Sequence, residues 1–251
     1  MIRGLYSSAL GMLASQAQSG IIADNIANVR TPGYKEEIGI NNAFPSVLIE
    51  RMGGDPASDS TPIGGMGTGV SVDSVALTNV QGALQTTGVK TDLALTSPGY
   101  FVVQTPGGER YTRDGHFQLD SNGVLQTSDG YALLGQKGPI GPLSPDFSVS
   151  TDGTILDKGQ IVDRLRVVQI PTNELQREGQ SLYSSTQPVQ ASGVGGGAVQ
   201  IVQGSVEASN VDISGQMVQM ITVMKAYEAN QKVIQTEDGM LDKAVNEVGK
   251  I

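Results

Sequence analysis

The chain of 251 residues contains no cysteine, no tryptophan and a single histidine, His116. Without cysteine there can be no disulfide, no thiolate zinc site and no cysteine nucleophile. Histidine is the side chain that most often binds metals and transfers protons near neutral pH, so one copy leaves little material for either task. We therefore expect no catalytic residue, no metal and no cofactor, and the composition disfavours an ordinary soluble enzyme.

Charge is also scarce. Only 16% of the residues are charged, and 25 acidic against 16 basic residues give a net charge of −9. Because phosphate binding needs clustered Lys and Arg, we expect no nucleic-acid partner. No apolar run reaches the length of a membrane span, and residues 1–8 lack the apolar segment of a cleaved signal peptide. The sequence thus predicts a protein that does not span a membrane and that either stays in the cytoplasm or is exported without such a signal.

Both ends of the chain have helical periodicity. In residues 1–29 and 212–249, apolar or small residues alternate in steps of three and four, which predicts two helices with coiled-coil-like seams. We expect these seams to form a subunit interface. Their positions are Ile2, Leu5, Ala9, Met12, Ala23 and Ile26 at one end, and Met217, Met220, Met224, Tyr227, Ile234, Leu241, Val245 and Val248 at the other.

The middle of the chain changes to the period of β-strands. Short β-prone runs between residues 100 and 134 are separated by Asp114-Gly115, Asn122-Gly123 and Asp129-Gly130. These pairs supply the positive φ of tight hairpin turns, so the region predicts an antiparallel meander. The fold class expected is α+β: paired terminal helices plus one central, mostly antiparallel β domain. We assign 1–35 and 207–251 to a terminal helical domain, 36–67 to a connector and 68–206 to a β-rich outer domain.

The N-terminal helix is weak on its own. Gly4, Gly11 and Gly20 each cost about 1 kcal/mol relative to alanine, and few ion pairs offset this. Its many small residues suit close approach of other helices. We infer that the two ends pair with each other and with ends of other copies, as a closed dimer or as a growing fibre. The alternative is a self-contained α+β monomer whose helices pack on the sheet.

One stretch resembles a known signature. Residues 25–35, Asn-Ile-Ala-Asn-Val-Arg-Thr-Pro-Gly-Tyr-Lys, are similar to the N-terminal signature of the bacterial flagellar rod and hook family. Residues 81–95, 111–117 and 203–230 resemble further motifs of that family, in order. The chain departs from the family pattern at two places. Ser97-Pro98 stands where the family usually has glycine, and residues 36–66 lack the family's usual Phe-x-x-Leu-Leu-Tyr-Gln run. The residues of the signature turn are Asn25, Asn28, Thr31, Pro32, Gly33, Tyr34 and Lys35.

The resemblance implies a structural axial subunit of the flagellar basal body, of the proximal or distal rod type. It implies that paired terminal helices form the inner tube of the rod and that the β domain lies outside. Implied partners are other copies of the chain, other rod and hook subunits, and the flagellar type III export apparatus. Two alternatives remain: a hook-type axial protein, and a secreted β-rich adhesin or phage-tail-like oligomer.

Overall fold

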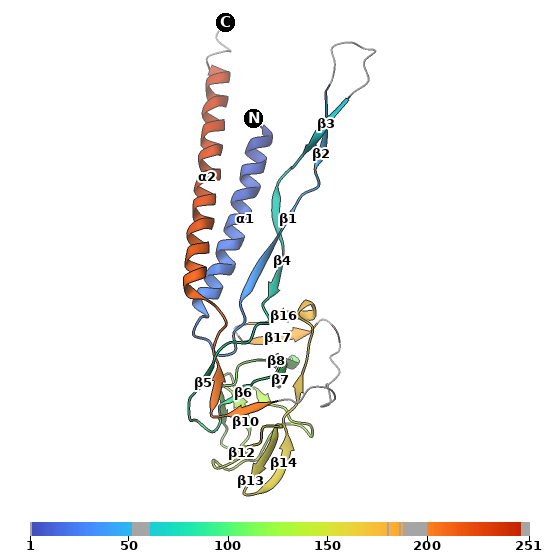
Figure 1. Ribbon diagram of the computed structural model, residues 1–251, viewed down its shortest axis with the longest axis vertical. Helices are drawn as coiled ribbons and strands as arrows, with labels where there is room; N and C mark the ends of the chain where they lie inside the picture. Colours follow the sequence, from blue (N-terminus) through green and yellow to red (C-terminus); the bar gives the residue numbers. More distant parts are fainter. Residues whose placement is uncertain (1, 52–60, 180, 186, 188–199, 247–251) are drawn as a thin grey trace. The chain divides into compact units, whose positions relative to one another are not determined.

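The computed structural model describes residues 2–51, 61–179, 181–185, 187 and 200–246 (Figure 1). It contains two long helices, short strands and one 3-10 turn, and it confirms the α+β class. The described part of the chain has no helix that is long and apolar enough to cross a membrane. The elements are α1 (Ile2–Ala27), β1 (Glu37–Ala43), β2 (Val47–Arg51), β3 (Thr61–Met66), β4 (Val70–Leu77), β5 (Leu84–Thr86), β6 (Leu93–Leu95), β7 (Tyr100–Thr105), β8 (Gly108–Thr112), β9 (Phe117–Leu119), β10 (Leu125–Thr127), β11 (Ala132–Leu133), β12 (Ser148–Val149), β13 (Thr154–Asp157), β14 (Gln160–Arg164), β15 (Val167–Val168), η1 (Thr172–Glu174), β16 (Leu175–Arg177), β17 (Leu182–Ser185), β18 (Ile201–Gln203), β19 (Ser205–Glu207) and α2 (Ile213–Asn246).

The chain separates into two compact units. The helical unit consists of Met1–Ile26, Glu37–Ala76 and Ile213–Ile251, and the β unit consists of Ala27–Glu36 and Leu77–Asp212. The two predicted helices are confirmed as α1 and α2. Residues 247–251, which include the predicted seam residue Val248, lie outside the described residues. The signature turn falls in the β unit except for Asn25, which belongs to the helical unit.

Residues 36–67, which we expected to act as a connector, contain β1, β2 and β3. β1 pairs with β4, and β2 pairs antiparallel with β3 from Val47↔Met66 onward. Within the helical unit this ribbon lies against α1. A Cβ placed on Gly39 would come 2.9 Å from Ile21 Cδ1, and one placed on Gly69 would come 2.5 Å from Leu10 Cδ1. Small residues in the ribbon therefore let the α1 side chains approach its backbone.

The β unit is organised around one eight-stranded sheet with the order β16-β17-β8-β7-β11-β10-β9, in which β15 also pairs with β7. The β7–β8, β9–β10 and β10–β11 pairings are antiparallel, so these predicted hairpins are confirmed. β8 and β9 are not neighbours, because β8 lies between β7 and β17, and the expectation of a hairpin turn at Asp114-Gly115 and of one continuous meander is wrong. β7 is buried on both faces. Phe101 and Val103 belong to one apolar cluster and Tyr100 and Val102 to another, which explains an unbroken apolar run in place of alternation.

Phe101 supports the first of these clusters. Its ring meets Phe117 edge to face, with centroids 5.3 Å apart and planes at 87°. We expect Phe101→Ala to lower the free energy of unfolding of the β unit by about 3–5 kcal/mol, because it leaves a cavity in a closed core. Urea denaturation followed by circular dichroism measures the loss. Ile161→Ala is the control, because that side chain is 70% exposed; an equal loss in both variants would contradict the placement of Phe101.

Candidate functional site: the signature turn and the terminal helices

The signature turn follows the end of α1 and is held by hydrogen bonds between Thr31 and Asn28. Thr31 N donates to Asn28 O at 3.0 Å, and Thr31 Oγ1 donates to Asn28 Oδ1 at 3.2 Å. Gly33 has a φ of 68°, and a Cβ on it would come 2.3 Å from the backbone of Arg113. Both the backbone conformation and the contact require glycine here. Pro32 is half-buried beside it, and Tyr34 and Lys35 are buried.

Asn25 connects α1 to the start of β1. Its Nδ2 donates to Glu37 O at 2.8 Å, and its Oδ1 accepts from Glu37 N at 2.9 Å. The side chain is only 1% exposed. An amide carries one acceptor and a donor group in the fork that a backbone peptide matches, so asparagine fits this position. The first asparagine of the signature thus fixes the path by which the chain enters the ribbon.

The β unit contains a buried carboxylate on β19. Glu207 accepts a hydrogen bond from Lys35 Nζ at 2.6 Å and another from Arg113 Nε at 2.6 Å. All three side chains are almost fully excluded from solvent. We call Lys35, Arg113 and Glu207 the charge centre. Buried charges persist only when they are paired and hydrogen-bonded, and this centre meets both conditions.

Backbone groups complete the charge centre. Gly82 N donates to Glu207 Oε1 at 2.9 Å, and Gly33 N donates to Glu207 O at 2.7 Å. Lys35 Nζ donates to Val80 O at 2.8 Å, and Arg113 donates to the carbonyls of Leu95 and Gly99. Segments that are far apart in sequence are thereby joined at one point.

At the charge centre, burial and the charge of Glu207 have opposite effects on the pKa of Lys35. Burial lowers the pKa of the Lys35 ammonium, and the hydrogen bond and negative charge of Glu207 act in the opposite direction. The positive charge of Arg113 lowers that pKa further. Nearby, the Arg177 guanidinium lies 4.3 Å from the centroid of the Tyr34 ring and its Nη1 donates to Tyr34 Oη at 2.8 Å. The buried Tyr34 thus joins the signature turn to Arg177 of β16.

Sequence reasoning missed part of this site. It singled out Lys35 and Gly33, but it treated Arg113 and Glu207 only as members of longer motifs. The usable signal was the rarity of charge, because Glu207 is the only charged residue within 203–211 in a chain with 16% charged residues; Arg113 gave no such signal, because Asp114 follows it directly. Among the described residues, no group of three His, Asp or Glu side chains is arranged to hold a metal ion.

The helical unit brings α1 and α2 together through small and polar residues. Asn25 Nδ2 donates to Gln216 Oε1 at 3.3 Å, and Ser19 Oγ lies 3.2 Å from Met220 Sδ. Gly11 faces Asn230, and Gly4 faces Glu237. The inward face of α2 is therefore marked by Gln216, Val223, Asn230 and Glu237.

The predicted seam is only partly enclosed within one chain. Met217 is 51% exposed and Met224 54%, because α2 presents to α1 the residues one position earlier. The other predicted seam positions also differ in exposure. Tyr227, Val245 and Ala23 are exposed, whereas Leu5, Ala9, Met12, Ile26, Met220, Ile234 and Leu241 are half-buried, and the side chain of Ile2 is outside the described set.

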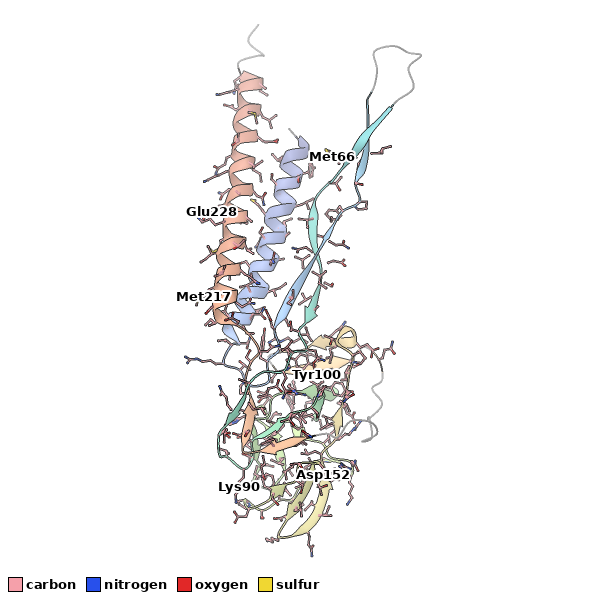
Figure 2. All side chains as sticks on the ribbon, viewed as in Figure 1. Met66, Lys90, Tyr100, Asp152, Met217 and Glu228 are labelled. Carbon is pink, nitrogen blue, oxygen red and sulfur yellow. The ribbon has the colours of Figure 1, made fainter. Side chains whose placement is uncertain are left out.

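The helical unit carries most of the exposed apolar surface. Of 22 large apolar side chains that are exposed among the described residues, 17 belong to the helical unit and five to the β unit. A groove of about 330 Å³ follows the α1–α2 junction, lined by Ser15, Gln16, Ser19, Val223, Met224, Tyr227 and Glu228. Figure 2 shows side chains projecting from α2 along its length, with Met217 and Glu228 labelled. A concentration of exposed apolar side chains on one part of a protein is typical of a protein–protein contact region.

Comparison with known proteins identifies the family. Residues 5–35 match the family model described as flagella basal body rod protein, and residues 202–247 match flagellar basal body rod FlgEFG protein C-terminal. The chain is 34% identical to the flagellar hook-basal body complex protein FlhO of Bacillus subtilis, with all of both chains covered. It is 35% identical to the flagellar basal-body rod protein FlgG of Buchnera aphidicola subsp. Schizaphis graminum, covering 97% of this chain and 98% of the relative. The chain belongs to the flagellar basal-body rod protein family.

Membership makes it a structural rod protein of the flagellar basal body, associated with other rod and hook components. Family membership also shows that the charge centre connects the two matched segments of the chain. Lys35 ends the first matched segment and Glu207 lies in the second, so the ion pair joins the two parts of the chain that the family models describe. The rod-protein signature is thus a contact in three dimensions as well as a sequence pattern.

We expect removal of the Glu207 charge to be the costliest single change at the centre. Glu207→Gln leaves Lys35 and Arg113 buried without a counter-ion, and we expect a loss of about 3–5 kcal/mol in the free energy of unfolding. Lys35→Met should cost less, because Arg113 still pairs with Glu207. Denaturant unfolding of both variants checks the order, and a larger loss for Lys35→Met would contradict it.

Asp114 gives a prediction about pH. Burial raises the pKa of its carboxyl above 3.8, against the hydrogen bond from His116 N. The folded state therefore binds this proton more tightly than the unfolded chain, so the stability contribution present below pH 3.8 is lost as the pH rises through the folded pKa. Asp114→Asn should accordingly gain thermal stability relative to the parent between pH 4 and pH 6.

Asp120→Asn serves as the control of opposite sign. Hydrogen bonds from Ser121 and Asn122 lower the pKa of Asp120, so its contribution is present above pH 3.8 and is lost as the pH falls through the folded value. Asp120→Asn should therefore have lower thermal stability than the parent throughout pH 4 to pH 6, and the difference should shrink only as the pH falls below 3.8. Equal pH profiles for parent and Asp114→Asn would contradict the burial argument.

Proposed function

We propose that this protein polymerises through its terminal helices into the rod that acts as drive shaft and transmits torque to the hook. The supporting observation is the concentration of exposed apolar side chains on the helical unit. Burying such surface against other copies is favourable by about 25 cal/mol per Å² of apolar area. In this proposal the helical unit forms the inner tube and the β unit the outer part.

The proposed subunit interface is the predicted seam on both helices. Met217 and Met224 support it, because their exposure in the single chain leaves them available to a neighbour. Heptad spacing of such residues favours coiled-coil-like packing between subunits. A contact between different surfaces of identical chains does not close, so it would extend as a helical fibre of the kind a shaft needs.

The signature turn and the charge centre would fix the fold of the β unit where residues 27–36 meet β19. Stiffness under torque requires that the segments next to the helices do not yield, and the buried ion pairs and the required glycine at position 33 suit that task. We further propose no enzymatic activity and no cofactor. Export through the flagellar type III apparatus, without a cleaved signal, would deliver the chain to the growing rod.

Assembly is tested by placing charge on the outer apolar face. Met217→Asp with Met224→Asp should abolish polymers of the full chain at concentrations at which the parent polymerises, because unpaired carboxylates cannot be buried between helices. Sedimentation and electron microscopy measure polymer, and circular dichroism checks that the fold is kept.

Gln219→Asp with Ala226→Asp is the matched control. It adds the same two charges at the same spacing of seven residues, on exposed positions of α2 outside the methionine series. We expect polymer formation close to that of the parent. Undiminished polymerisation of the methionine variant would exclude this face as the interface.

A further inference from the structure

α2 carries two series of residues with heptad spacing, displaced by one position. The first series is Gln216, Val223, Asn230 and Glu237, and the second is Met217, Met224, Gln231, Asp238 and Val245. The first has one apolar member in four and faces α1, whereas the second has three apolar members in five and is exposed. This arrangement is the reverse of what hydrophobic burial alone would choose for a pair of helices.

The polar series meets α1 at matched intervals. Glu237 faces Gly4, Asn230 faces Gly11, and Gln216 accepts from Asn25 at 3.3 Å. Each step of seven residues forward along α1 corresponds to seven residues backward along α2. Constant steps of this kind define one register of an antiparallel helix pair.

Glycines on α1 make room for these side chains. A Cβ on Gly4 would come 2.2 Å from Glu237 Oε1, and one on Gly11 would come 2.8 Å from Asn230 Nδ2. Gly20, by contrast, has nothing within 4 Å of such a Cβ. The close approach is thus confined to the two glycines that face polar residues of α2.

The polar contacts do not maximise stability. Glu237 Oε2 is buried with no hydrogen-bond partner among the described residues. Turning α2 by one residue, about 100°, would bring the methionine series toward α1 instead. The observed rotation is favoured by the amide contact between Asn25 and Gln216 and by the carboxylate of Glu237 beside the first turn of α1, where free N–H groups attract negative charge.

We propose that Gln216, Asn230 and Glu237 determine the rotation and register of α2 on its own α1. Polar residues at core positions of helix pairs select one register at a cost in stability. These three residues thereby keep Met217 and Met224 exposed. The use of that exposed surface in assembly rests on the proposed function, whereas the register itself does not.

The absence of cysteine makes the register measurable in the full chain. Ser19→Cys with Met220→Cys reports the observed register, because Ser19 Oγ and Met220 Sδ are 3.2 Å apart. Ser19→Cys with Ile221→Cys reports a turn of α2 by one residue, which would bring the methionine series toward α1. In the parent background, mild oxidation of dilute protein should cross-link the first pair and leave the second reduced.

Replacing the polar series removes the proposed determinant. With Gln216→Leu, Asn230→Leu and Glu237→Leu together, the cross-link at 19–220 should fall several-fold and the cross-link at 19–221 should appear. The matched control adds three leucines at exposed polar positions of α2, Gln219→Leu, Gln235→Leu and Asp242→Leu. That control should retain the parental pattern.

Several outcomes overturn the proposal. They are an unchanged 19–220 cross-link in the leucine variant, equal effects of the two leucine sets, or no 19–220 cross-link in the parent, dilute or concentrated. If circular dichroism shows that the triple variant loses helix, Gln216→Leu alone is used, and an unchanged pattern there also overturns it. A parent that cross-links at 19–220 but never polymerises would contradict the proposed function and leave the register assignment intact.

Discussion

The β unit depends on one buried carboxylate. Glu207 receives Lys35, Arg113 and the amide of Gly82, and its own carbonyl receives Gly33 N. A buried charge is tolerated only when every neighbour keeps its place, so the paths of four separate segments are constrained together. The charge centre therefore sets two requirements on the signature turn. Position 35 needs an ammonium that pairs with Glu207, and position 33 needs a residue without a side chain.

The helical unit follows the opposite logic. The contacts that define the register of α2 on α1 are mostly small or polar, and Met217 and Met224 are exposed. A monomer optimised for its own stability would bury Met217 and Met224; a subunit of the basal-body rod has a reason to leave them outward. The same feature accounts for Gly4 and Gly11 of α1, which face polar side chains of α2.

Much of the fold could be predicted from local pattern. Helical periodicity identified α1 and α2, and turn pairs such as Asn122-Gly123 identified hairpins such as β9–β10, because both signals arise between residues close in sequence. The strands within 36–67 were not predicted, since their pairing depends on partners up to β4 and their composition is rich in glycine and polar residues. Glu207 and Arg113 were not predicted as partners of Lys35, since they are distant in sequence.

The sequence by itself determined the α+β class, the two helices, the absence of cysteine chemistry and the resemblance to the rod family. Only the tertiary structure decided which face of α2 meets α1. Periodicity detects a stripe of apolar residues but not its partner, and the series beginning at 216 and 217 differ by a single position. The choice between them is made by Gly4, Gly11 and Asn25 on another helix, which no local window of sequence contains.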